Sequence, residues 1–125
     1  MLGDKEAIAM IAVKDMRAAA AFYEGTLGLA RLSAQGGEVI TYRSGSSALN
    51  VYHSQYAGTN KATALVWNVG DEIDRIAAAL KSNGVVFDHY AMPGLSLQGD
   101  VHVGGDMKVA WFRDPDGNIL SLVNG

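Results

Sequence analysis

The chain has 125 residues, which is enough for one domain and too few for two ordinary ones. It contains no cysteine, which excludes disulfide frameworks, thiolate metal sites and cysteine nucleophiles. Ten Lys and Arg residues against 13 Asp and Glu residues give a formal charge of −3, without the basic excess that nucleic-acid-binding proteins usually show. The N-terminus lacks a signal-peptide pattern, and its apolar stretch, residues 7–13, is too short to span a membrane. We therefore expect one cytoplasmic domain over residues 1–125 that binds neither nucleic acid nor membrane.

The first half of the chain predicts one strand, one helix and three further strands. The apolar run over residues 7–13 suits a strand that is buried on both faces. Asp15 can cap the helix that follows, which ends near Gly25 and Gly28. Turns rich in glycine and serine then separate three predicted strands, at about residues 29–35, 38–43 and 47–53.

The second half predicts the same order of elements with one insertion. A strand over residues 63–69 precedes Asp71, a second candidate cap, and a helix that ends at Asn83-Gly84. Further strands are expected at residues 85–90, 107–113 and 118–123, the last two joined by an Asp-Pro-Asp-Gly turn. The long segment 91–106 is interpreted as a loop, either a lid over a site or a surface excursion.

The two halves are related as an internal repeat. Val13-Lys14-Asp15 matches Val69-Gly70-Asp71 at an offset of 56 residues, and the offset rises to 71 after the segment 91–106. The sequence therefore predicts two βαβββ modules, at about residues 7–55 and 63–124, within a single domain.

Alternation along the strands assigns residues to the two faces of the sheet. Residues that point toward the helices are nearly all apolar, Trp67 among them, whereas the opposite face also carries polar side chains. The polar residues predicted on this opposite face are Asn50, Tyr52, Asn68 and Ser121. We therefore expect an α+β fold, with one curved mixed sheet around a cavity and the helices on its outer face.

An ordered set of motifs covers almost the whole chain. It consists of Val13-Lys14-Asp15-Met16, Phe22-Tyr23, Leu27-Gly28-Leu29 and the run from Trp111 to Ile119 that contains the Asp-Pro-Asp-Gly turn. With the paired repeat, this set resembles the vicinal oxygen chelate superfamily, which includes glyoxalase I, bleomycin-resistance proteins and extradiol dioxygenases. The resemblance implies the two-module fold and a symmetric homodimer with two equivalent cavities. It leaves open whether the modules pair within one chain or between chains.

The resemblance also locates the positions where metal-dependent members carry four His or Glu ligands. Here those positions hold Ile8, Asn50, Ala64 and Ser121. Isoleucine and alanine have no donor atom in their side chains, and Asn and Ser are weak neutral donors for divalent transition metals. We therefore expect no metal and no other cofactor.

Candidate ligand-binding residues follow from the face assignment: Met10, Asn50, Tyr52, Asn68, Trp111, Arg113 and Ser121. Trp111 and Arg113 share one face of their strand, where an aromatic ring and a cation could hold a flat anionic ligand. Packing with a surface charge is the alternative for this pair.

Catalytic residues are not identified, and the weak candidates for acid–base chemistry are His102 and Tyr52. His102 lies in the long loop, where a solvated side chain is the alternative. The three histidines, His53, His89 and His102, show no metal-ligand spacing.

The leading functional hypothesis is a metal-free small-molecule binding protein that sequesters a drug or metabolite. One alternative is a metal-free isomerase or lyase that uses a Tyr or His as acid and base. A metal-dependent lyase or dioxygenase with unusual ligands is a third.

Overall fold

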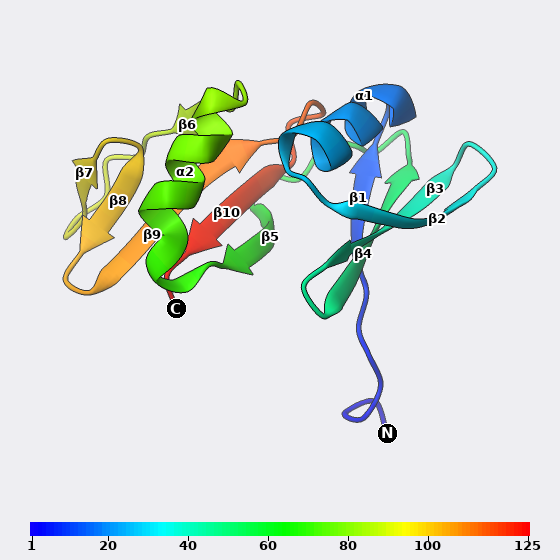
Figure 1. The fold of residues 1–125 in the computed structure, drawn as a ribbon, viewed down its shortest axis with the longest axis horizontal. Coiled ribbons are helices and arrows are strands. Elements are labelled where there is room, and N and C mark those ends of the chain that lie inside the picture. The colour runs from blue at the N-terminus through cyan, green and yellow to red at the C-terminus, as the bar shows by residue number, and fades with distance from the viewer.

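A computed structural model describes residues 1–125 as two modules that lie side by side (Figure 1). The first module contains β1 (Ala9–Val13), α1 (Met16–Ala20), the π-helical turn η1 (Ala21–Thr26), β2 (Ala30–Gln35), β3 (Val39–Ser44) and β4 (Ser47–His53). The second contains β5 (Thr63–Asn68), the 3₁₀ turn η2 (Gly70–Glu72), α2 (Ile73–Ser82), β6 (Phe87–Asp88), β7 (Ser96–Gln98), β8 (Val101–Gly104), β9 (Met107–Arg113) and β10 (Ile119–Val123). None of these helices is long and apolar enough to cross a membrane.

The two modules have equivalent strand connections. The first sheet has the order β1-β4-β3-β2, and the second has the order β5-β10-β9-β8-β7, with β6 also paired to β9. In each module the first strand runs parallel to the last, and the neighbouring pairs are antiparallel. The predicted α+β fold with two βαβββ modules is confirmed, and hydrogen bonding divides its strands into two sheets.

The predicted helix boundaries are confirmed at α1 and corrected at α2. The carboxylate of Asp15 caps α1 by accepting 3.0 Å hydrogen bonds from the backbone N–H groups of Arg17 and Ala18. Asp71 does not cap α2, because the chain first makes the turn η2 and the helix begins two residues later. The side chain of Asn68 instead accepts a hydrogen bond from the Gly70 N–H, which stabilises this turn.

The segment 91–106 is not an unstructured loop. Its residues 96–104 form the β7–β8 hairpin, and β8 extends the second sheet by pairing with β9. The turn before the hairpin packs closely on β8: a Cβ atom added to Gly104 would lie 2.5 Å from Leu95 Cδ2 and 2.8 Å from the Gly94 carbonyl oxygen. The prediction failed because β7 has only three residues, too few to show an alternation of apolar and polar positions in the sequence.

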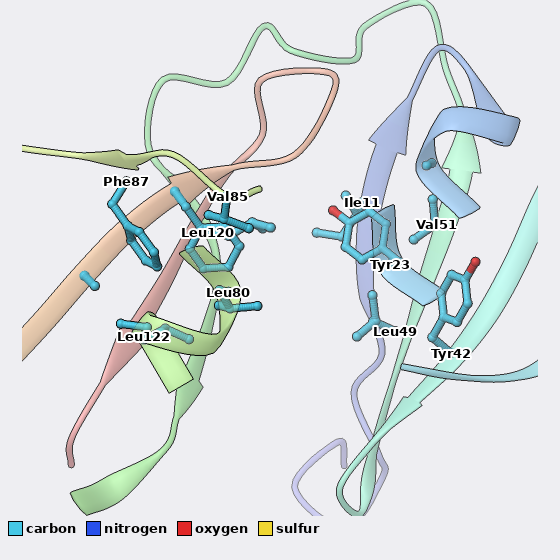
Figure 2. Close-up of a cluster of buried hydrophobic side chains, with 14 of the residues drawn as sticks. Ile11, Tyr23, Tyr42, Leu49, Val51, Leu80, Val85, Phe87, Leu120 and Leu122 are labelled. Atoms are coloured by element: carbon cyan, nitrogen blue, oxygen red, sulfur yellow. The ribbon is translucent and has the colours of Figure 1, made fainter. Parts of the chain in front are cut away.

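The apolar core lies between the helices and the two sheets and contains buried residues of both modules. Figure 2 shows Ile11, Tyr23 and Val51 in the first module and Leu80, Phe87 and Leu120 in the second. The ring of Phe22 contacts that of Phe112, and the Trp67 Nε1–H donates a 2.9 Å hydrogen bond to Ser44 Oγ, so the modules also touch directly.

A buried polar network joins the modules at the Asp-Pro-Asp-Gly turn. Asp114 is 5% exposed and accepts a 2.8 Å hydrogen bond from the hydroxyl of Tyr23 in η1. The side-chain amide of Asn118 donates to the Ala12 carbonyl at 2.8 Å, and Asp116 accepts from the Lys14 N–H at 3.1 Å. Burial, and then the neighbouring Asp114 carboxylate, hold the pKa of Tyr23 well above its usual range. The turn therefore fastens β1 and η1 to β9 and β10.

Candidate functional site

The sheet faces turned away from the helices, here called the open faces, carry the predicted ligand-binding residues. In β4, Leu49 and Val51 point to the helix side and are 3% and 0% exposed. Asn50 and Tyr52, which alternate with them along the strand and point to the open face, are half-buried. In β10, Leu120 and Leu122 are buried on the helix side, where they belong to the core cluster. The face assignment made from alternation is therefore confirmed.

On the open face of the first sheet, Met10, Asn50 and Tyr52 come together. Met10 lies opposite Asn50 in the parallel β1–β4 ladder, and its sulfur is 3.5 Å from the Asn50 Nδ2. The Asn50 Oδ1 accepts a 2.6 Å hydrogen bond from the Thr41 hydroxyl, so Thr41 fixes the orientation of the amide. Thr41 was missed by sequence reasoning, although the alternation along β3 places it opposite Asn50.

On the open face of the second sheet, Ser121 lies beside Trp111. The two residues are opposite each other in the β9–β10 ladder, and Ser121 is 2% exposed. Asn68 is exposed, and its side-chain oxygen is engaged by the turn at Gly70. The open face is hollowed next to Trp111, where a cavity of about 400 Å³ lies between Trp111, Ile119 and the segment that carries Tyr90.

Arg113 does not offer an unpaired cation on this face. Its Nε donates a 2.9 Å hydrogen bond to the Asp88 carboxylate, and this contact raises the pKa of the guanidinium further above its usual value. The sequence predicted a cation beside Trp111, but it did not reveal that Asp88 on β6 pairs with that cation. The β6–β9 ladder places Asp88 opposite Trp111, which brings the carboxylate within reach of Arg113.

His102 is a buried strand residue and not a solvated loop residue. It lies on β8, is 1% exposed, and its Nε2 accepts a 2.9 Å hydrogen bond from the Tyr90 N–H. This contact requires a lone pair on Nε2, so the neutral ring carries its proton on Nδ1, which has no hydrogen-bond partner. The rings of Tyr90 and Trp111 pack on the imidazole, with centroid separations of 6.1 and 4.9 Å.

The four positions implied for metal ligands do not fit a divalent metal ion. Ile8 and Ala64 are exposed apolar residues, Ser121 is buried, and Asn50 is engaged by Thr41. No group of three or more His, Asp or Glu side chains is placed to hold a metal. His89 and His53 pair instead with Asp100 and Glu38. The four side chains at the implied ligand positions lack the anionic or imidazole donors that a divalent metal ion requires.

The predicted site residues thus form two groups on different sheets. Met10, Asn50 and Tyr52 belong to the first sheet, and Trp111, Arg113 and Ser121 belong to the second. The cavity beside Trp111 is not lined by any of the first group. Trp67 lies on the helix side as predicted, where it lines a smaller apolar cavity of about 180 Å³.

Comparisons with known proteins agree on a family and a fold. The family model of the Glyoxalase/Bleomycin resistance protein/Dioxygenase superfamily matches residues 7–122. No curated protein sequence matches the chain.

Three solved structures illustrate the structural similarity. A glyoxalase family protein from Enterococcus faecalis is 20% identical, with a TM-score of 0.73, covering 98% of this chain and 99% of that one. A bleomycin-binding protein complexed with bleomycin is 19% identical, with a TM-score of 0.71 and coverage of 97% and 98%. The fosfomycin resistance protein FosX from Mesorhizobium loti is 13% identical, with a TM-score of 0.71 and coverage of 98% and 92%. At these identities the likeness concerns the fold.

Proposed function

Because the chain belongs to the glyoxalase/bleomycin resistance protein/dioxygenase superfamily, we propose that it is a small-molecule binding protein that holds its ligand without a metal ion. Its role would be to sequester a drug or a metabolite in the cytoplasm. The observation that carries the proposal is the occupation of the four ligand positions by Ile8, Asn50, Ala64 and Ser121. A metal-dependent lyase or dioxygenase would need donors that these side chains do not supply.

The chemistry of the open faces supports binding. They combine apolar side chains, among them Met10 and Val66, with a few polar groups, chiefly Ser121 and Asn50, whose amide is oriented by Thr41. Binding sites for small molecules generally have this mixture of an apolar lining and few polar contacts. The bleomycin-binding protein that shares the fold is a neighbour with a bound drug, which makes a ligand of that kind a reasonable first probe.

An acid–base enzyme without a metal is the less favoured candidate. His102, one of its two candidate residues, is covered by Tyr90 and Trp111 and uses its Nε2 to hold the Tyr90 backbone. Tyr52 remains on the open face, with no hydrogen bond to its hydroxyl that would activate it.

We further propose a symmetric homodimer with two equivalent sites. Ile8, Met10 and Val66 on the open faces are about half exposed in the single chain. A second copy that covers them would enclose the ligand and bury apolar surface at the same time.

The proposal is tested by isothermal titration of the purified protein with bleomycin and with fosfomycin, each with and without EDTA. We expect at least one compound to bind, with the same affinity in both conditions and with no chemical change by mass spectrometry. The variant Tyr52→Ala should lose more free energy of ligand binding than free energy of unfolding. Affinity that disappears with EDTA, or conversion of the compound, would contradict the proposal.

A further inference from the structure

The linker between the modules, residues 54–62, brings a lysine to the cavity on the open face of the second sheet. Lys61 lines the cavity of about 400 Å³ beside Trp111, and it also lines an adjacent cavity of about 340 Å³. Tyr90 and Ile119 border both cavities as well. Lys61 lies between the two modules that the sequence predicted, at about residues 7–55 and 63–124, and it was not among the predicted site residues.

The linker is held in place by specific contacts. Gly58 has a φ of 76°, and a Cβ atom at this position would collide with the Asp116 carbonyl oxygen, so the linker lies directly on the Asp-Pro-Asp-Gly turn. The Thr59 hydroxyl donates a 2.7 Å hydrogen bond to the Tyr56 carbonyl. The Asn60 side chain accepts a 3.0 Å hydrogen bond from the Ala62 N–H. Lys61 is therefore presented from an ordered turn.

The walls of the larger cavity are aromatic and apolar. Tyr90 and Trp111 meet edge to face, with ring centroids 5.1 Å apart, and Met92 and Ile119 are among the other residues that line the cavity. His102 supports this wall from behind, because its Nε2 holds the Tyr90 N–H. A cavity of this kind suits a flat ring.

The charge at this site comes from Lys61. Neither cavity is lined by a carboxylate, and Lys61 has no acidic partner within 4 Å. Arg113 borders the smaller cavity but is already paired with Asp88. A ligand with a negative group would therefore find one uncompensated cation at the mouth of an aromatic cavity.

We propose that this cavity selects flat aromatic carboxylates, with the ring against Tyr90 and Trp111 and the carboxylate at the Lys61 Nζ. The assignment rests on the proposed small-molecule binding function and adds to it a ligand class and a specificity residue. It replaces Arg113 by Lys61 as the group that would meet the anion.

The test uses 2-naphthoate and its neutral analogue 2-naphthamide as probes, measured by isothermal titration on the full chain. Wild-type protein should bind 2-naphthoate about two- to fivefold more tightly than the amide, which is the range of one ion pair at an exposed side chain such as Lys61. Lys61→Met should remove this preference and leave the affinity for the amide unchanged. Lys81→Met, which removes one charge on α2 together with its 3.8 Å ion pair to Asp100, should change neither affinity.

The possible failures separate this inference from the proposed function. If 2-naphthoate does not bind, if both probes bind equally, or if Lys61→Met keeps the preference, the inference is wrong. If bleomycin or fosfomycin binds and its affinity falls in Tyr52→Ala while 2-naphthoate does not bind, the inference is overturned and the proposed function stands. Absence of binding for all four compounds would overturn both.

Discussion

At the scale of single residues, the hydrogen bond between Tyr23 and Asp114 joins two of the sequence motifs, Phe22-Tyr23 and the Asp-Pro-Asp-Gly turn, and thereby the two modules. Both side chains are buried, and they join η1 of the first module to the turn after β9 of the second. Loss of the phenol hydroxyl in Tyr23→Phe removes one hydrogen bond to a buried charged group. We expect a loss of about 1.5–3 kcal/mol in the free energy of unfolding, measured with urea.

Tyr52→Phe is the matched control, because the structure shows no hydrogen bond to that hydroxyl on the open face, and its stability should stay within about 0.5 kcal/mol of wild type. Equal stability of Tyr23→Phe and wild type would contradict the role given to the Tyr23–Asp114 contact.

The raised pKa of Tyr23 predicts how the free energy of unfolding depends on pH in alkaline solution. In the unfolded chain the phenol loses its proton near pH 10, whereas the folded protein retains it to a higher pH. The stabilisation is therefore complete below about pH 10 and is lost as the pH rises above that value.

Unfolding titrations between pH 8 and 11.5 should show a steeper fall in stability for wild type than for Tyr23→Phe. Tyr42, whose pKa is also raised by burial and by Glu24, is present in both proteins, so its own titration contributes to both curves. Parallel curves would mean that Tyr23 titrates normally.

At the scale of elements, the β7–β8 hairpin is the largest departure from the expected fold. Gly104→Ala tests how the preceding turn is docked, since the added methyl group would meet the Gly94 carbonyl and Leu95. We expect a loss of about 1–3 kcal/mol in the free energy of unfolding, the usual cost of overpacking.

Gly37→Ala serves as the control, because its added methyl group would meet no atom within 4 Å. If Gly104→Ala is as stable as Gly37→Ala, the turn over residues 92–95 does not pack on β8.

The elements that the sequence predicted correctly have strong periodic signals. The strands β3 and β4 alternate buried and more exposed residues, and Asp15 has the position and chemistry of a helix cap. The failures lie where contacts between distant segments decide the outcome. Asp88 pairs with Arg113 only because β6 pairs with β9, and Lys61 lines the cavity beside Trp111 only because the linker packs on the turn at Asp116. Neither contact leaves a periodic pattern in the sequence.

At the scale of the whole molecule, the proposed homodimer would cover the open faces of the sheets. The half-exposed apolar residues Ile8, Met10 and Val66 favour burial against a second copy. Sedimentation at micromolar concentration should give twice the chain mass of 13.2 kDa. Val66→Glu should shift the equilibrium toward monomer, because it places a charge in the face that the second copy would cover. A wild-type mass near that of one chain would contradict the proposed homodimer.

The central claim is that the family site of this chain works without a metal ion, and elemental analysis tests it most directly. Protein purified and dialysed without chelator should contain far less than one Zn, Ni, Mn or Fe per chain, because Ile8, Asn50, Ala64 and Ser121 cannot replace the water shell of such an ion. Near-equimolar transition metal, bound between the strands that carry these residues, would contradict the account and favour a metal-dependent enzyme.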